Sequence, residues 1–149
     1  MTSENQSMSF KPLQRQTNEH HVLNNELDRC KSKQHGICHP IMLNVSDIYI
    51  MVRVSNCPRF LKDCSEPHST LDIVQFGWVP YIFGTAKFSE KPKNIFKQHL
   101  YTIKDWCKEN NMSLYIENIM SEKLYNHYLE LGFKETNQER SLLLPYSSL

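Results

Sequence analysis

The order of the predicted elements indicates an α/β fold in which helices cover both faces of a mixed sheet. Two observations predict this fold class: stretches rich in β-branched residues recur along the chain, and stretches with apolar residues at helical spacing separate them. The chain has 149 residues, 40% of them apolar, which is the size and composition of one domain with a real core. We therefore expect residues 1–149 to form a single domain.

The chain begins with a polar stretch, residues 1–8, which we expect to be flexible. Residues 9–16 are predicted to be a short edge strand, because Pro12 cannot donate to a β-ladder. A helix should follow, with Thr17 as its N-cap, apolar residues at helical spacing along it and Gly36 as a natural end.

The next segment is rich in residues that favour strands. Residues 41–54 predict one strand, or two strands with a turn at Ser46 and Asp47. Residues 55–70 contain many Pro, Ser and Asn residues and are predicted to be a loop.

An apolar, β-rich stretch at 71–88 precedes the best-defined helix. In this stretch Gly77 and Pro80 mark either a hairpin or a bulge in one long strand, and both alternatives stay open. Pro92 suits the first turn of the following helix, which has an apolar stripe and ends at residues 109–111.

The last third of the sequence predicts a strand, a helix and a strand. Residues 113–119 and 140–146 are the strands, and we expect them to pair in one sheet with the helix 121–131 between them. Ser121 is the expected N-cap of that helix, and Gly132 stands where a left-handed C-cap is wanted.

Composition argues against several classes of function. The net charge is +1, so no basic excess signals nucleic acid, and no apolar run is long enough to span a membrane. The N-terminus lacks a secretory signal, and five cysteines without a CxxC pair favour reduced thiols inside a cell. We expect no metal site, since the spacing of the soft-ligand residues matches no zinc module. Those residues are Cys30, His35, Cys38 and His39.

The phrase "SLYIENIMSEKLYNHYLELGFKE" at 113–135 resembles the closing half of the GNAT acetyltransferase superfamily. The resemblance covers roughly residues 71–144 and implies a GNAT-like mixed sheet. It places Ser121 where the family has an Asn, and Tyr128 where the family has the general acid toward the departing CoA thiolate. The alternative is that Tyr128 is a core residue whose hydroxyl bonds a backbone group.

The other half of the family's site is missing from the sequence. GNAT proteins hold the CoA pyrophosphate on a glycine-rich turn at a helix N-terminus, and the equivalent "FSEKPKNIF" at 88–96 contains no glycine. Pro92 removes an N–H group and Glu90 adds a negative charge, which lysines offset only in part. We therefore expect no cofactor, and acetyl-CoA only in the alternative. The residues that would then contact CoA are Lys91, Lys93, Asn94 and Ser121.

A narrower resemblance fits the missing turn. Residues 78–135 are similar to the degenerate GNAT-like proteins of short-tailed bacteriophages, of which internal virion protein A is an example. This resemblance implies a non-catalytic structural or binding protein, located in the virion or the host cytoplasm. Its partners would be other virion or host proteins.

The alternative is an acetyl-CoA-dependent N-acetyltransferase with a divergent pyrophosphate-binding turn. Such an enzyme needs a base for the acceptor amine and an acid for the leaving thiolate, the role that the resemblance gives to Tyr128. Glu66, Asp72 and Glu117 are the candidate bases, and the sequence does not choose among them.

Overall fold

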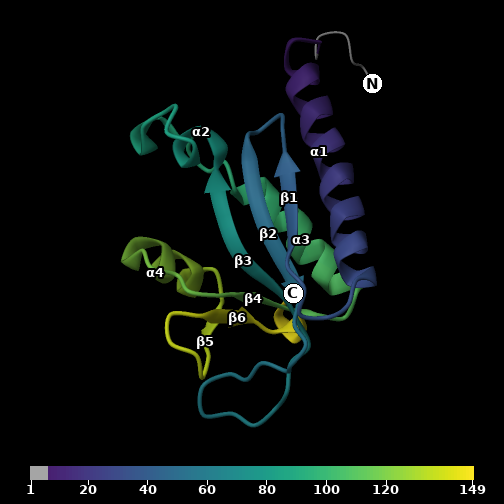
Figure 1. Cartoon of the computed structure of the whole chain (residues 1–149), viewed down its shortest axis with the longest axis vertical. Coiled ribbons are helices and arrows are strands. Elements are labelled where there is room, and N and C mark those ends of the chain that lie inside the picture. Colours follow the sequence, from purple (N-terminus) through teal and green to yellow (C-terminus); the bar gives the residue numbers. More distant parts are fainter. Residues whose placement is uncertain (1–6) are drawn as a thin grey trace.

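The computed structural model describes the backbone of residues 7–149 and the side chains from Glu19 onward. Its elements, in chain order, are α1 (Ser7–Ser32), β1 (His39–Leu43), β2 (Ile48–Val54), β3 (Thr70–Trp78), α2 (Val79–Ile82), η2 (Phe88–Glu90), α3 (Lys97–Glu109), β4 (Ser113–Ile116), α4 (Glu122–Glu130), β5 (Lys134–Glu135), β6 (Leu142–Leu144) and η3 (Tyr146–Ser148). The strands of the described chain form one 6-stranded sheet in the order β1-β2-β3-β4-β6-β5 (Figure 1). Strands β3 and β4 run parallel and the other neighbours antiparallel, so the predicted mixed sheet is confirmed.

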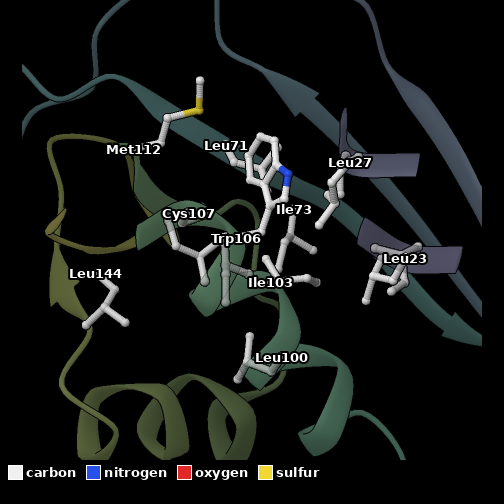
Figure 2. Packing of buried hydrophobic residues seen from close by; sticks show 14 of the residues in the cluster. Leu23, Leu27, Leu71, Ile73, Leu100, Ile103, Trp106, Cys107, Met112 and Leu144 are labelled. Carbon is white, nitrogen blue, oxygen red and sulfur yellow. The ribbon is translucent and has the colours of Figure 1, made fainter. Parts of the chain in front are cut away.

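One face of the sheet is covered by α1 and α3. Leu23 and Leu27 of α1 are fully buried, and they meet Ile103 of α3 and Ile73 of β3 in one core cluster. Figure 2 shows these side chains converging from the two helices and the strand. This core forms because the apolar stripe of each helix has no other apolar surface to bury against.

Helix α1 is longer than predicted. It includes residues 9–16, so the expected edge strand is wrong. That prediction rested on Pro12, but α1 continues through this residue, the sixth of the helix, and loses only the one backbone hydrogen bond that the proline nitrogen cannot donate. Of the residues 1–8 that we expected to be flexible, 1–6 lie outside the described residues and 7–8 open the helix.

The stretch 41–54 forms two strands, as one of the two alternatives predicted. β1 and β2 pair antiparallel, with Ile41 opposite Ile50. The turn between them contains Asp47 at a φ of 57°, a left-handed conformation that Asp tolerates better than most residues.

The stretch 71–88 contains no hairpin, and its one bulge lies at Val74 and not at Gly77 or Pro80, so both alternatives for these two residues are wrong. Strand β3 ends at Trp78 and α2 follows at once, with the proline in its first turn, where a missing N–H is harmless. Gly77 pairs with Tyr49, on the face opposite to α1, and a Cβ at position 77 would collide with Cδ1 of Ile82. Helix α2 therefore packs on the second face.

Helix α3 begins at Lys97 instead of Pro92, so the predicted start is wrong. Asn94 between them has a left-handed φ of 57°, which interrupts any helix that began at the proline. The loop from α2 to α3 is therefore longer than the sequence suggested.

The final strand, helix and strand agree with the prediction. β4 and β6 pair antiparallel, shorter than the predicted ranges, and α4 lies between them in the chain. Ser121 Oγ accepts the N–H of Leu124 at 3.2 Å, and Gly132 has a φ of +102°, so both expected caps are present. No helix in the described part of the chain is long and apolar enough to cross a membrane.

Candidate active site

The parallel strands β3 and β4 separate partway along the sheet. They pair from Thr70–Ile73 against Ser113–Ile116, and the last bond between them is from the Glu117 N–H to the Ile73 carbonyl at 3.3 Å. β3 then continues, paired with β2 alone, so residues 74–78 present one edge without a strand partner in the described chain. Figure 1 shows the strands leading apart, β3 to α2 and β4 to α4.

Two local irregularities produce this separation. Val74 is an extra residue between Ile73 and Gln75, whose partners on β2 are adjacent, and such a bulge bends and twists its strand. Beyond β4, Asn118 has a left-handed φ of 58° and turns the chain away from β3.

An ion network centred on Asp72 lies on the second face, before the point of separation. Asp72 is fully buried, and its Oδ2 accepts from Arg53 Nε at 3.1 Å, Arg53 Nη2 at 2.9 Å and Arg59 Nη2 at 2.7 Å. The Thr70 hydroxyl donates to Oδ1 at 2.7 Å. Because this carboxylate is buried and accepts hydrogen bonds on both oxygens, it stabilises the fold and is a poor candidate for a base.

Glu117 differs from Asp72 because solvent reaches its carboxylate. Arg53 Nη2 donates to its Oε1 at 2.6 Å, and 27% of the Glu117 side chain is exposed. Burial opposes the charge of Arg53, but the hydrogen bonds and charges of Asp72 and Glu117 outweigh it and raise the Arg53 pKa. Glu66 is exposed in the loop before β3. Of the three candidate bases, Glu117 is therefore the one that stands, partly exposed, where the strands separate.

Tyr128 is a core residue of α4, with 4% of its surface exposed and its ring 5.3 Å from that of Phe133. Burial raises the pKa of its hydroxyl to about 12. Within residues 19–149 the structure shows no hydrogen-bond partner for this hydroxyl. The backbone bond expected for a purely structural Tyr is absent from the described chain.

The residues predicted to contact phosphate lie between β3 and α3. Lys91 Nζ lies 5.5 Å from the centre of the Phe88 ring, and Lys93 and Asn94 are exposed. The Glu90 carboxylate accepts the N–H of Lys87 at 2.6 Å. One oxygen of the carboxylate that counted against an anion site is thus already hydrogen-bonded within the turn.

The N-terminus of α3 adjoins the unpaired edge of β3. The ring of Phe96, the N-cap residue, lies 3.5 Å from that of Phe76 on β3. The N–H groups of Gln98 and His99 have no backbone partner among the described residues. These groups and the positive end of the helix dipole favour an anion beside the strand edge.

A second buried polar cluster lies behind this helix start. His99 Nε2 is 3.2 Å from Ser46 Oγ and 3.8 Å from Glu19 Oε1, and Glu19 Oε2 accepts the Ser46 N–H at 2.9 Å. Burial lowers the pKa of His99, and Glu19 opposes this in part. Ser46 and Glu19 both lie beside Nε2 of His99. In a nucleophilic triad the acid binds the ring nitrogen that the nucleophile does not, so these three residues do not form one.

The sequence-predicted residues fall into two groups. Lys91, Lys93 and Asn94 follow β3, whereas Ser121 and Tyr128 belong to α4, and no hydrogen bond of the described residues joins the groups. Sequence reasoning missed the polar residues that come together only through tertiary contacts. They are Glu19, Ser46, Arg53, Arg59 and His99. For Arg53 alone a signal existed, since strand alternation sets it opposite the apolar face of β2.

Comparison with known proteins gives the fold. No family model and no curated protein matches the sequence. The crystal structure of a KacT point mutant matches with a TM-score of 0.50 and 14% identity over 68% of this chain. AtaT complexed with acetyl-methionyl-tRNAfMet matches with a TM-score of 0.46, 14% identity and the same coverage. The chain spans 63% of the length of each of these structures. KacT and AtaT are GNAT-family acetyltransferases.

The chain has the GNAT fold. This finding corrects the prediction of a non-catalytic virion protein, because KacT, whose fold the chain shares, is an acetyltransferase. The comparisons support neither a bacteriophage protein nor a degenerate site. The expected absence of a cofactor is not confirmed either, since GNAT proteins use acetyl-CoA.

Proposed function

We propose that this protein is an acetyl-CoA-dependent N-acetyltransferase with a divergent pyrophosphate-binding turn. The observation that carries the proposal is the unpaired edge of β3 at residues 74–78. A free strand edge binds an extended chain through the hydrogen bonds that a neighbouring strand would make. The pantetheine arm of CoA is such a chain and contains two amide groups, so its chemistry fits this edge.

The region before α3 is compatible with the phosphates of CoA. Because α3 begins at Lys97, Pro92 removes no N–H group from its first turn, and the N–H groups of Gln98 and His99 stay available within the described chain. Lys91, Lys93 and Asn94 supply charge and a polar group nearby in the sequence, and Ser121 is the proposed contact from α4.

The proposed chemistry needs a base and an acid from this chain. When bound, acetyl-CoA supplies an acetyl group activated as a thioester. Glu117 takes a proton from the acceptor amine, since its carboxylate is partly exposed and Arg53 holds one of its oxygens. Tyr128 gives a proton to the leaving sulfur, and a pKa of about 12 keeps its hydroxyl protonated near neutral pH, as an acid requires. The products are an amide and a thiol, so the protons balance.

Titration calorimetry with acetyl-CoA at physiological salt tests the proposal, together with thiol release in the presence of a panel of amines. We expect saturable one-to-one binding in the micromolar range, about 8 kcal/mol. The double variant Lys91→Glu with Lys93→Glu should weaken binding by about tenfold or more, because it reverses two charges near the phosphates. The matched control, Lys104→Glu with Lys108→Glu, makes the same charge change farther along α3 and should alter binding less than about twofold. Absence of binding up to about 1 mM acetyl-CoA, with no thiol release, would refute the proposal.

A further inference from the structure

The segment between β3 and α3 exposes a group of aromatic rings that the proposed chemistry does not use. Tyr81 is 51% exposed, Phe83 71% and Phe88 60%, although all three lie within eight residues of one another. Large apolar rings are normally buried, so a cluster left open to solvent marks a binding surface.

Two of the rings are held in place. Tyr81 and Phe88 pack edge to face, with centroids 5.3 Å apart and planes at 72°. Lys91 Nζ lies 5.5 Å from the centre of the Phe88 ring. We call Tyr81, Phe88 and Lys91 the aromatic platform. Its rings are fixed by each other and still expose about half of their surface, which is what stacking against a flat ligand requires.

The charge around the platform favours an anionic ligand. Residues 79–97 contain four lysines, Lys87, Lys91, Lys93 and Lys97, and a single acidic residue, Glu90. The Glu90 carboxylate already accepts the backbone N–H of Lys87. A second copy of this chain would bring the same lysines to the surface and be repelled, so self-association is disfavoured.

We infer that the aromatic platform binds the adenosine 3′,5′-bisphosphate end of CoA, with the adenine on the exposed rings and the phosphates among the lysines. This inference rests on the proposed function. Aromatic faces flanked by lysines are the chemistry with which proteins hold nucleotides without reading the base. The segment also leads into α3, whose Gln98 and His99 N–H groups lack backbone partners in the described chain. Stacking thereby replaces the glycine-rich cradle that the turn at 88–96 lacks.

The test is titration calorimetry of the full chain with adenosine 3′,5′-bisphosphate, which lacks the pantetheine arm and the acetyl group. Phe88→Ala and Phe88→Leu should each weaken binding by about tenfold or more, because neither side chain can stack, whereas Phe88→Trp should bind as the wild type does. Phe88 is exposed, so these variants should fold, and thermal unfolding of each variant checks that they do.

Tyr101→Ala is the matched control. Tyr101 is 53% exposed and has Lys104 Nζ at 5.6 Å from its ring centre, so it reproduces an open ring with a lysine elsewhere on the surface. Its loss should change nucleotide binding by less than about twofold.

The outcomes separate this inference from the proposed function. If acetyl-CoA binds but Phe88→Ala binds adenosine 3′,5′-bisphosphate as tightly as the wild type, the platform is overturned and the enzyme proposal stands. The same holds if Phe88→Ala loses binding to vesicles of anionic phosphatidylglycerol and keeps its nucleotide affinity. If acetyl-CoA neither binds nor reacts, the proposed function falls, and the inference falls with it.

Discussion

Replacing Asp72 with Asn should destabilise the protein strongly while preserving its shape. The amide oxygen can still accept from the arginines, and the Thr70 hydroxyl can turn to accept from the new NH₂ group, so the loss is mainly that of the charge. Arg59 then keeps no acidic partner among the described residues, and Arg53 keeps only Glu117. Breaking a buried ion pair by removing one partner costs about 3–5 kcal/mol.

The two arginine side chains are 20% and 22% exposed, so water compensates in part and the lower end of this range applies. We expect a loss of about 3 kcal/mol, which lowers the melting temperature of a chain of this size by about 9 °C. Urea unfolding of Asp72→Asn against the wild type measures it. The control is Glu117→Gln, which removes a 27% exposed partner of the same Arg53 and should cost less than about 1 kcal/mol. Equal losses in the two variants, or a loss below about 0.5 kcal/mol in Asp72→Asn, would refute the view that Asp72 is a structural anchor.

Three further predictions concern single residues. Tyr128→Phe should reduce acetyl transfer by roughly 10²–10⁴ while stability changes by less than about 1 kcal/mol, since the hydroxyl has no partner in the described chain; unchanged turnover would leave Tyr128 a packing residue. Glu117→Gln should reduce turnover by a similar factor, whereas Glu66→Gln should leave turnover unaltered. The reverse pattern in the same rate assay would identify Glu66, in the loop before β3, as the base. His99 has a pKa lowered by burial from its usual 6.5, so below that pH the unfolded chain binds more protons and stability falls as the solution is acidified. His99→Gln should make the melting temperature less sensitive to pH between about 7.5 and 5, and an equally steep decline would show that other groups dominate.

The glycine-free turn shows how a misplaced helix start changes the interpretation of a sequence. Pro92 and Glu90 counted against phosphate binding because both were assigned to a helix start. The helix begins later, at Lys97, and the Glu90 carboxylate accepts a backbone N–H within the turn. The absence of glycine argues against the family's usual cradle, but exposed rings in the same segment offer another way to hold a nucleotide.

Local patterns in the sequence determined the elements whose cues lie within a few residues. The apolar stripe of α3, the Ser121 cap and the Gly132 C-cap are such cues, and the expected pairing of β4 with β6 follows from the order of elements around them. These predictions succeeded because helical spacing and capping are short-range physics.

Tertiary structure alone decided the candidate site. Strand register brings Arg53, Asp72 and Glu117 together from three different strands or their ends, across sequence separations of 19 and 64 residues. The bulge at Val74, which helps to part β3 from β4, has no signature in its own residue type. Such features depend on which backbone groups pair across the sheet. This pairing is fixed only when the whole sheet assembles, because every hydrogen bond between strands needs a group from each of the two strands.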